Sequence, residues 1–325
     1  MTKRSSLIVA SLFLFFVSVQ VKSHRDIQEE KTEIKKITLM LDWFVNPNHG
    51  PIIIAQQKGY FQKERLEVKI QEPTDPTLPP KLVATGDVDI AVYYQPGLTQ
   101  GVDRGLAVAW AGTLIDCVLD GVMVLDAGPI KSLASLKGKT IGVSFNSAES
   151  AKLDTMFNPY GFSAKNIKMI NVGWNLSSSL MTGQVDAIMG VCRNFELNVL
   201  KSHGSKGRIF CFEENGIPAY DQMIFIVNRK KYDKKVIRGF LRSVEAGVKD
   251  ITSHPEESWN VFVGSNPKQL DNDLNKRAWI DTIPYFARSP QSRNDDRYEG
   301  YAQFLYKHAL IKKILKADDL MVSLD

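Results

Sequence analysis

Residues 40–61 read Met-Leu-Asp-Trp-Phe-Val-Asn-Pro-Asn-His-Gly-Pro-Ile-Ile-Ile-Ala-Gln-Gln-Lys-Gly-Tyr-Phe, the most informative run of residues in this chain. An apolar strand, Ile37–Leu41, runs into a polar loop. Pro51 pre-sets the first turn of a helix, and Gly59 supplies the left-handed residue that ends it. Open α/β sheets bind ligands at the carboxyl ends of strands, just before helices. The stretch therefore predicts an α/β fold with a ligand site in this loop.

The loop carries side chains that suit a flat molecule with hydrogen-bonding edges. Trp43 can cover the face of a ring, while Asn46, Asn48 and His49 can read its edge. The alternative is a β–α turn in which Asn and Pro only shape the backbone. We predict that Trp43, Asn46 and His49 contact a ligand. Asp42 and His49 also resemble an acid/base pair, but no nucleophile accompanies them.

The amino terminus has the pattern of a secretory signal peptide over residues 1–23. Lys3 and Arg4 precede an apolar run from Leu7 to Val19, and small residues follow near Ser23. The run is short for a membrane span, although an uncleaved anchor is the competing interpretation. We expect a periplasmic protein.

The composition indicates a globular chain with room for two lobes. Hydrophobic residues make up 44% and charged residues 24%. The formal charge is +5, and basic residues are spread among acids, which is not a nucleic-acid footprint. Cys117, Cys192 and Cys211 leave one disulfide possible but provide no metal-ligand spacing.

Two segments follow the same pattern, at Leu82–Val92 and Leu180–Gly190. In each, a helix closes on Thr-Gly and Val-Asp then opens a short buried strand. The two copies are too far apart for a solenoid repeat. They predict that the same βαβ unit occurs once in each of two similar lobes.

The hydrophobic pattern extends this to the whole chain. Strands are predicted near 37–41, 66–70, 88–94, 121–125, 139–143, 167–172, 185–190 and 223–227. Helices are predicted near 51–58, 78–85, 96–104, 147–157, 176–182 and 194–202, and the chain is helical from residue 234 onward. Such alternation predicts a mostly parallel sheet in each lobe, flanked by helices, with a ligand cleft between the lobes. The expected division is a first lobe from 36–126, a second from 127–218, and a return over 219–325 that adds the C-terminal helices. Crossings near 121–130 and 216–224 would form a hinge.

Further candidates for ligand contact follow the predicted strands and face this cleft. They are Tyr94, Gln95, Asn146, Trp174, Glu196, Tyr220 and Gln222. The backbone N–H groups of the Ser144–Ser147 loop could also bind an anion, and Arg193 is the nearby cation that the pattern identifies.

Several of these segments together carry a family resemblance. They are Asp42-Trp-Phe with Asn46, Asn48 and His49; Gln56-Gln-Lys-Gly-Tyr-Phe61; Tyr94-Gln-Pro96; Val172-Gly-Trp174; Glu196; and Gly216-Ile-Pro-Ala-Tyr220. With them, the mature chain resembles the periplasmic binding proteins that take up formylaminopyrimidine, a thiamine pyrimidine precursor, for an ABC importer. The resemblance implies a type II two-lobed clamp, a small planar heterocyclic ligand and an ABC permease as partner. We expect a monomer with no catalytic residues, metal, cofactor or nucleic acid.

The chain is also similar to the thiamine pyrimidine synthases, but it departs from them. Their cofactor lysine corresponds to Tyr93 and their reactive histidine to Gly97, and their cysteine cluster is absent from Pro218–Met223. Tyrosine and glycine cannot supply that chemistry, so an enzyme is the weaker hypothesis. Relative to the importers, Gln222 stands where a glutamate is usual, which leaves a flavin or an alkyl sulfonate as alternative ligands.

Overall fold

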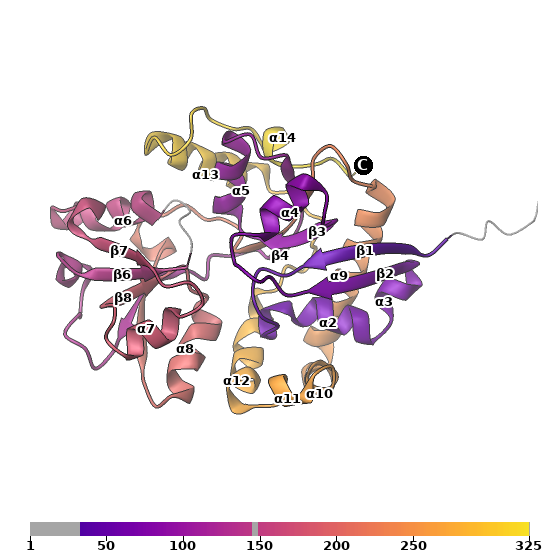
Figure 1. Cartoon of the computed structure of the whole chain (residues 1–325), viewed down its shortest axis with the longest axis horizontal. Coiled ribbons are helices and arrows are strands. Elements are labelled where there is room, and N and C mark those ends of the chain that lie inside the picture. The colour runs from indigo at the N-terminus through magenta and orange to yellow at the C-terminus, as the bar shows by residue number, and fades with distance from the viewer. Residues whose placement is uncertain (1–32, 145–148, 325) are drawn as a thin grey trace, which may run out of the picture. The chain divides into compact units, whose positions relative to one another are not determined.

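The computed structural model describes residues 33–144 and 149–324, and its strands form two five-stranded sheets (Figure 1). The first sheet has the order β2 (Leu66–Gln71), β1 (Lys35–Met40), β3 (Ile90–Tyr93), β10 (Met223–Asn228) and β4 (Val108–Ile115). The second has the order β7 (Lys168–Asn171), β6 (Thr140–Val143), β8 (Ala187–Met189), β5 (Gly121–Leu125) and β9 (Gly207–Cys211). We call each sheet with its helices a lobe.

The two sheets share one topology. In the first, β2, β1 and β3 are parallel, and β10 runs antiparallel to both β3 and β4. In the second, β7, β6 and β8 are parallel, and β5 runs antiparallel to both β8 and β9. Four strands of each sheet therefore point one way, and the fourth position holds the strand that enters from the other lobe. The predicted mostly parallel sheets and two-lobed fold are confirmed.

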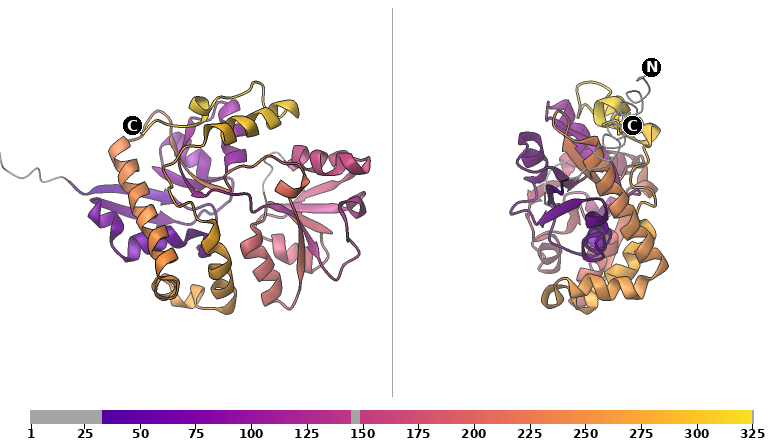
Figure 2. Two further views of the ribbon diagram at one scale, coloured as in Figure 1. Left: turned by 180° about the vertical axis from the view of Figure 1, so that it is seen from behind. Right: turned by 90° about the vertical axis from the view of Figure 1, so that its right-hand side faces the viewer.

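Helices connect and cover these strands, as Figure 2 shows from two further sides. They are α2 (Gly50–Gln57), α3 (Tyr60–Lys63), α4 (Pro79–Thr85), α5 (Gln95–Asp103), α6 (Glu149–Phe157), α7 (Leu176–Met181), α8 (Arg193–Ser202), α9 (Lys234–Ser253), α10 (Pro255–Gly264), α11 (Pro267–Leu270), α12 (Asp273–Thr282), α13 (Asp295–Lys307) and α14 (Ala317–Leu320). Short 3₁₀ turns are η1 (Pro47–His49), η2 (Leu133–Leu136), η3 (Asn158–Tyr160), η4 (Ala164–Asn166), η5 (Glu213–Asn215) and η6 (Ile283–Tyr285).

The boundary predicted between the lobes was wrong at one strand. The sequence pattern grouped residues 121–125 with the first lobe, but β5 pairs with β8 and β9 in the second sheet. The first crossing therefore precedes Gly121. The return crossing ends where predicted, because β10 starts at Met223 in the first sheet. The two crossings are joined where Leu119 N–H donates to the Gln222 side-chain oxygen at 2.9 Å.

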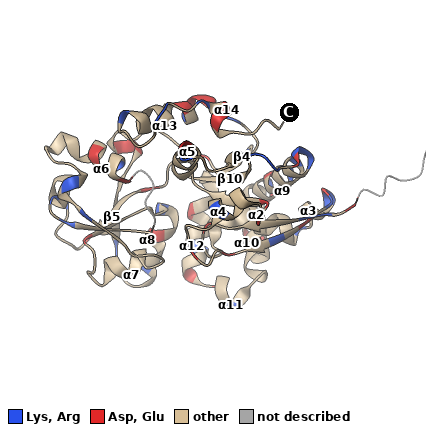
Figure 3. Ribbon diagram, turned by 45° about the horizontal axis from the view of Figure 1, so that its top comes forward, with Lys and Arg blue, Asp and Glu red and all other residues tan. Residues whose placement is uncertain are grey.

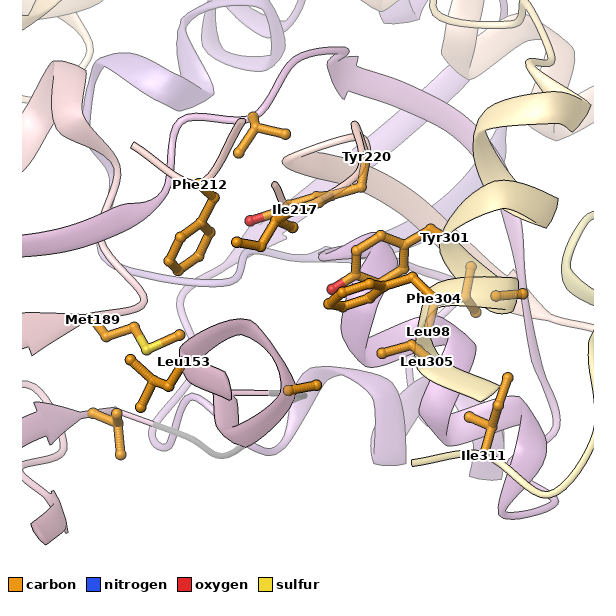
Figure 4. Close-up of a cluster of buried hydrophobic side chains, with 14 of the residues drawn as sticks. Leu98, Leu153, Met189, Phe212, Ile217, Tyr220, Tyr301, Phe304, Leu305 and Ile311 are labelled. Carbon is orange, nitrogen blue, oxygen red and sulfur yellow. The ribbon is translucent and has the colours of Figure 1, made fainter. Parts of the chain in front are cut away.

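Apolar clusters of buried residues form the core of each lobe and extend from one lobe to the other. One lies between the first sheet and the helices α2 and α9, where Phe61 and Phe240 stack with ring centroids 5.5 Å apart. Here α2 and α9 approach so closely that a Cβ atom on Gly247 would lie 2.3 Å from the Pro51 carbonyl oxygen. The second cluster runs from one lobe to the other, and Figure 4 shows Ile217 and Tyr220 of the return crossing between Phe212 on one side and Tyr301 on the other.

Charge is distributed over both lobes. Basic and acidic segments are interspersed in Figure 3, so this view shows no continuous basic face. No helix within residues 33–144 and 149–324 is both long and apolar enough to cross a bilayer. The predicted signal peptide, residues 1–23, lies outside the described residues.

Candidate functional site

The loop after β1 is built around a buried hydrogen-bond chain. Asp42 accepts from His49 Nε2 at 2.9 Å and from the hydroxyl group of Tyr94. The backbone N–H of Asn46 donates to His49 Nδ1 at 3.2 Å, so Nδ1 carries no proton and Nε2–H points to Asp42. His49 is fully buried and both its ring nitrogens have protein partners. The His49 ring therefore fixes the position of Asp42, and Asp42 in turn fixes the hydroxyl group of Tyr94.

Asn46 has a similar structural role in this loop. Its side-chain oxygen caps η1 by accepting from Asn48 N–H at 2.9 Å, and its amide nitrogen donates to the Phe44 carbonyl oxygen at 2.9 Å. Such a cap satisfies a donor that the short helix leaves open. The side chain is 5% exposed, so it shapes the loop that presents Trp43.

Trp43 and Trp174 meet edge to face from opposite lobes. Their ring centroids are 4.2 Å apart with an interplanar angle of 71°, and Phe44 lies 4.7 Å from Trp174. Trp43 follows β1, whereas Trp174 follows β7 in the second sheet. The predicted convergence of strand-end aromatics therefore occurs for these two residues. A planar ligand can enter between them only if the lobes separate.

A small cavity lies where residues of both lobes and the hinge meet. Its volume is about 30 Å³, and its walls are Tyr94, Pro96, Asp120, Glu149, Lys152, Gly190, Cys192, Tyr220 and Gln222. This is about the volume of one water molecule, whereas small-molecule sites are typically about 300–1,000 Å³. Tyr94, Tyr220 and Gln222 were all predicted to contact the ligand, and they line one space. Predicted residue Asn146 lies outside the described residues.

Glu196 sits on the first turn of α8, where removal from solvent changes its acidity. Burial raises the pKa of Glu196 to about 8, and hydrogen bonds from backbone N–H groups lower it by less. One of these comes from Cys192 at 2.6 Å. Near neutral pH the carboxyl group is therefore mostly protonated, and it can donate to a ring nitrogen as well as accept.

The remaining predicted residues, Gln95 and Gln222, anchor the hinge. The Gln95 side-chain oxygen accepts from Asp221 N–H at 2.7 Å, and Gln95 is fully buried. Its amide nitrogen has no hydrogen-bond partner among the described residues. The side-chain oxygen of Gln222 accepts a hydrogen bond from Leu119 N–H. The side-chain amides of Gln95 and Gln222 therefore both fix the return crossing against the first lobe.

Lys152 of α6 is the cleft residue that the sequence pattern did not identify. Its Nζ lies 3.5 Å from Asp120 Oδ2, with side chains 3% and 5% exposed. The same nitrogen lies over the rings of Phe212 and Tyr220, at 4.8 and 5.2 Å from their centroids. Arg193, the cation that was predicted near the cleft, instead pairs with Glu213 at 2.7 Å.

Hydrogen bonds also join the lobes through α8. Asn194 Nδ2 donates to Asn48 Oδ1 at 2.6 Å and to Thr282 Oγ1 at 2.7 Å. One turn on, Asn198 Nδ2 donates to Asp281 Oδ2 at 2.7 Å. We call these contacts the α8 latch. Asn194 lies at the start of α8, and its side chain spans the two lobes.

The side chain of Tyr93 packs directly against Gly97. A Cβ atom on Gly97 would lie 2.5 Å from the Tyr93 hydroxyl oxygen and 2.7 Å from its ring carbon. The family resemblance described above predicts that these positions correspond to the lysine and histidine of the synthases. A tyrosine ring packed over a glycine leaves no room for an added histidine side chain unless the ring moves.

Larger cavities occur away from the strand ends. One of about 690 Å³ lies between α10 and α12, and its lining includes Trp259, Trp279 and Ile280. Ligands of open α/β folds bind at the carboxyl ends of strands, which favours the interlobe cleft over this cavity. The three cysteines are free thiols, and within the described residues no cluster of His, Cys, Asp or Glu can hold a metal ion.

Comparison with solved structures defines the class of fold. The alkanesulfonate-binding protein of Xanthomonas axonopodis pv. citri, bound to MOPS, superposes with a TM-score of 0.71 over 90% of this chain and 99% of its own, at 14% identity. The fold is therefore that of the two-lobed periplasmic binding proteins.

Sequence comparison identifies the family. The chain belongs to the NMT1/THI5-like family, whose model matches residues 46–258. It is 45% identical, over 90% of its length and 93% of the relative, to a Haemophilus influenzae protein provisionally named for thiamine biosynthesis. It is 31% identical to the formylaminopyrimidine-binding protein of Halalkalibacterium halodurans, over 98% and 97% of the two chains. At 27% identity, over 84% and 88%, it is similar to the 4-amino-5-hydroxymethyl-2-methylpyrimidine phosphate synthase of Legionella pneumophila.

Proposed function

We propose that this protein is the solute-binding component of an ABC importer, and that it carries a formylaminopyrimidine-like thiamine precursor through the periplasm to a membrane permease. The observation that carries the proposal is the convergence of Trp43 and Trp174 from opposite lobes. The similarity to a formylaminopyrimidine-binding protein over nearly the whole of both chains supports the choice of ligand.

Binding would follow the clamp mechanism. The cavity of about 30 Å³ is too small for a pyrimidine, so the lobes must separate to admit it. A ligand that touches both lobes only when they close then shifts the population toward the closed state. The aromatic faces of Trp43 and Trp174 would cover the ring. Protonated Glu196 would donate to a ring nitrogen.

The site favours a binding protein over a synthase. Tyr93 and Gly97 pack together where the synthases carry a cofactor lysine and a reactive histidine. The site also disfavours a small anion such as a sulfonate, because the cavity wall holds the carboxyl groups of Asp120 and Glu149 against the single ammonium group of Lys152. We therefore infer an uncharged heterocycle and no catalysis.

Isothermal titration with formylaminopyrimidine tests the proposal. Trp174→Ala removes one aromatic face, and Glu196→Ala removes a half-buried hydrogen-bonding partner, so each is expected to weaken binding about tenfold or more. Tyr160→Ala is the control, since Tyr160 is an aromatic of the second lobe that is 48% exposed. A wild-type protein that binds an alkyl sulfonate and no pyrimidine would overturn the assignment.

A further inference from the structure

Lys152 is a buried ammonium group with too few partners. An ammonium group has three N–H donors. Among the described residues, the one oxygen placed near Nζ belongs to Asp120, at 3.5 Å, which is longer than a good hydrogen bond. The other contacts are the faces of Phe212 and Tyr220. Burying a charge is costly unless it is paired and hydrogen-bonded, so this site is incomplete as a purely structural ion pair.

Asp120 is held more firmly than its partner. Its Oδ1 accepts backbone N–H groups from Gly121 at 2.7 Å and from Gly190 and Val191 at 3.1 Å. These contacts fix Asp120 in the first crossing, and Asp120 in turn fixes the direction of the Lys152 ammonium group. The hydroxyl group of Tyr220, which is 1% exposed, has no hydrogen-bond partner within the described residues. The unpartnered Tyr220 hydroxyl group and the Lys152 ammonium group, whose ion pair with Asp120 is long, therefore belong to the wall of one cavity.

We propose that Lys152, oriented by Asp120 and assisted by the Tyr220 hydroxyl group, binds a neutral carbonyl oxygen on a substituent of the ligand. The inference rests on the proposed function and assigns the formyl oxygen of a formylaminopyrimidine to this end of the cavity. A carbonyl oxygen has two lone pairs, so it can accept from both groups at once. A neutral acceptor fits better than a phosphate, because Asp120 and Glu149 already place two carboxyl groups in the same wall.

The ring and its substituent would thus be recognised separately. Trp43, Trp174 and Glu196 would hold the aminopyrimidine ring, while Lys152 and Tyr220 would select ligands with a carbonyl group. A compound that keeps the ring but lacks the oxygen would leave the ammonium group without the partner it gains on binding. Lys152 would therefore determine specificity more than it determines binding of the ring.

The test compares three compounds by isothermal titration. They are formylaminopyrimidine, 4-amino-2,5-dimethylpyrimidine, which has the ring without the oxygen, and 4-amino-5-hydroxymethyl-2-methylpyrimidine phosphate. The variants are Lys152→Met, which keeps length but removes the charge, and the double variant Lys152→Met/Asp120→Asn, which removes both charges if the single variant fails to fold. Lys139→Met is the control, because Lys139 is 38% exposed and pairs with Asp186 at the surface of the second lobe.

Removal of Lys152 is expected to weaken binding of formylaminopyrimidine by about 10- to 100-fold, as for a hydrogen bond to a charged group, and to change binding of the dimethyl compound less than about threefold. Equal losses for both compounds, or no loss for either, would overturn the inference while the wild-type protein still bound pyrimidines. A loss confined to the phosphate ester would also overturn it, in favour of an anion site. Wild-type protein that binds none of the three would refute the proposed function and this inference with it.

Discussion

The carboxyl group of Glu196 shows how the fold changes the acidity of a single residue. The carboxyl group lies on the first turn of α8, and burial raises its pKa from 4.5 to about 8. In the unfolded chain the group ionises near its ordinary pKa, whereas in the folded chain it keeps its proton up to about pH 8. The unfolded state therefore releases a proton first, and Glu196 reduces stability progressively as pH rises between these two values.

Glu196→Gln is expected to remove this pH dependence. The amide cannot ionise, so the variant should match the wild type near pH 4.5 and unfold at a temperature several degrees higher near pH 8. Thermal unfolding followed by circular dichroism across this range gives the comparison. Equal melting temperatures at both ends of the range would show that the carboxyl group is ionised in the folded protein. Glu214→Gln is a suitable control, because Glu214 is an exposed glutamate of η5.

At the scale of the elements, the contact between α2 and α9 decides how the first lobe packs. Gly247 lies in the middle of α9, directly over the carbonyl oxygen of Pro51. A methyl group there would meet backbone atoms, which cannot rotate out of the way as a side chain can. The two helices would have to move apart and would lose contact along the apolar cluster between them.

Gly247→Ala should therefore destabilise the protein by about 1–3 kcal/mol, although alanine favours helix more than glycine does. Gly300, in the middle of α13, is the matched control, since a Cβ atom there would meet nothing within 4 Å. Gly300→Ala should stabilise by about 0.5–1 kcal/mol through helix propensity alone. Urea unfolding of both variants separates the two effects. The packing account fails if both substitutions have the same sign.

The sequence predicted most elements but missed the last strand of each sheet. The strands that follow βα units have clear turn and glycine punctuation, as at Gly86 and Gly183. In contrast, β4 and β9 are edge strands, and each pairs within its sheet only with one strand that is distant in sequence, β10 and β5 respectively, so no local pattern marks them. For the same reason, the sequence pattern assigned β5 to the wrong lobe. Its partners β8 and β9 are set by tertiary structure.

The site was predicted in part. Strand-end position correctly brought Trp43 and Trp174 together, and it placed Tyr94, Tyr220 and Gln222 around one cavity. Strand-end position could not show that the polar groups of Asn46 and His49 form their hydrogen bonds within the loop itself. Lys152 was missed because a lysine inside a helix has no distinguishing motif. Only the packing of α6 against Asp120 and Tyr220 reveals it.

The α8 latch joins the two lobes, so it should set the balance between the open and closed forms of the protein. Asn198→Ala removes the hydrogen bond to Asp281 across the lobes. We expect ligand affinity to fall roughly 5- to 30-fold, from about 1–2 kcal/mol lost in the closed form alone. Small-angle scattering with and without ligand should show a larger radius of gyration in the variant before ligand is added. Asn260→Ala is the control, because Asn260 is an exposed residue of α10. Unchanged affinity and scattering would mean that the latch contributes nothing to closure.

The strand order also has a consequence for how the chain folds as it is synthesised. All five strands of the second sheet lie between residues 121 and 211, so that sheet can be completed from one continuous segment. The first sheet must wait, because β4 pairs through β10, which begins at Met223. Pulse-labelled hydrogen exchange during refolding should therefore protect amides of β5 and β8 before those of β4. Until the return strand arrives, the apolar β4 has an unpaired edge, the kind of surface that chaperones and aggregation both exploit.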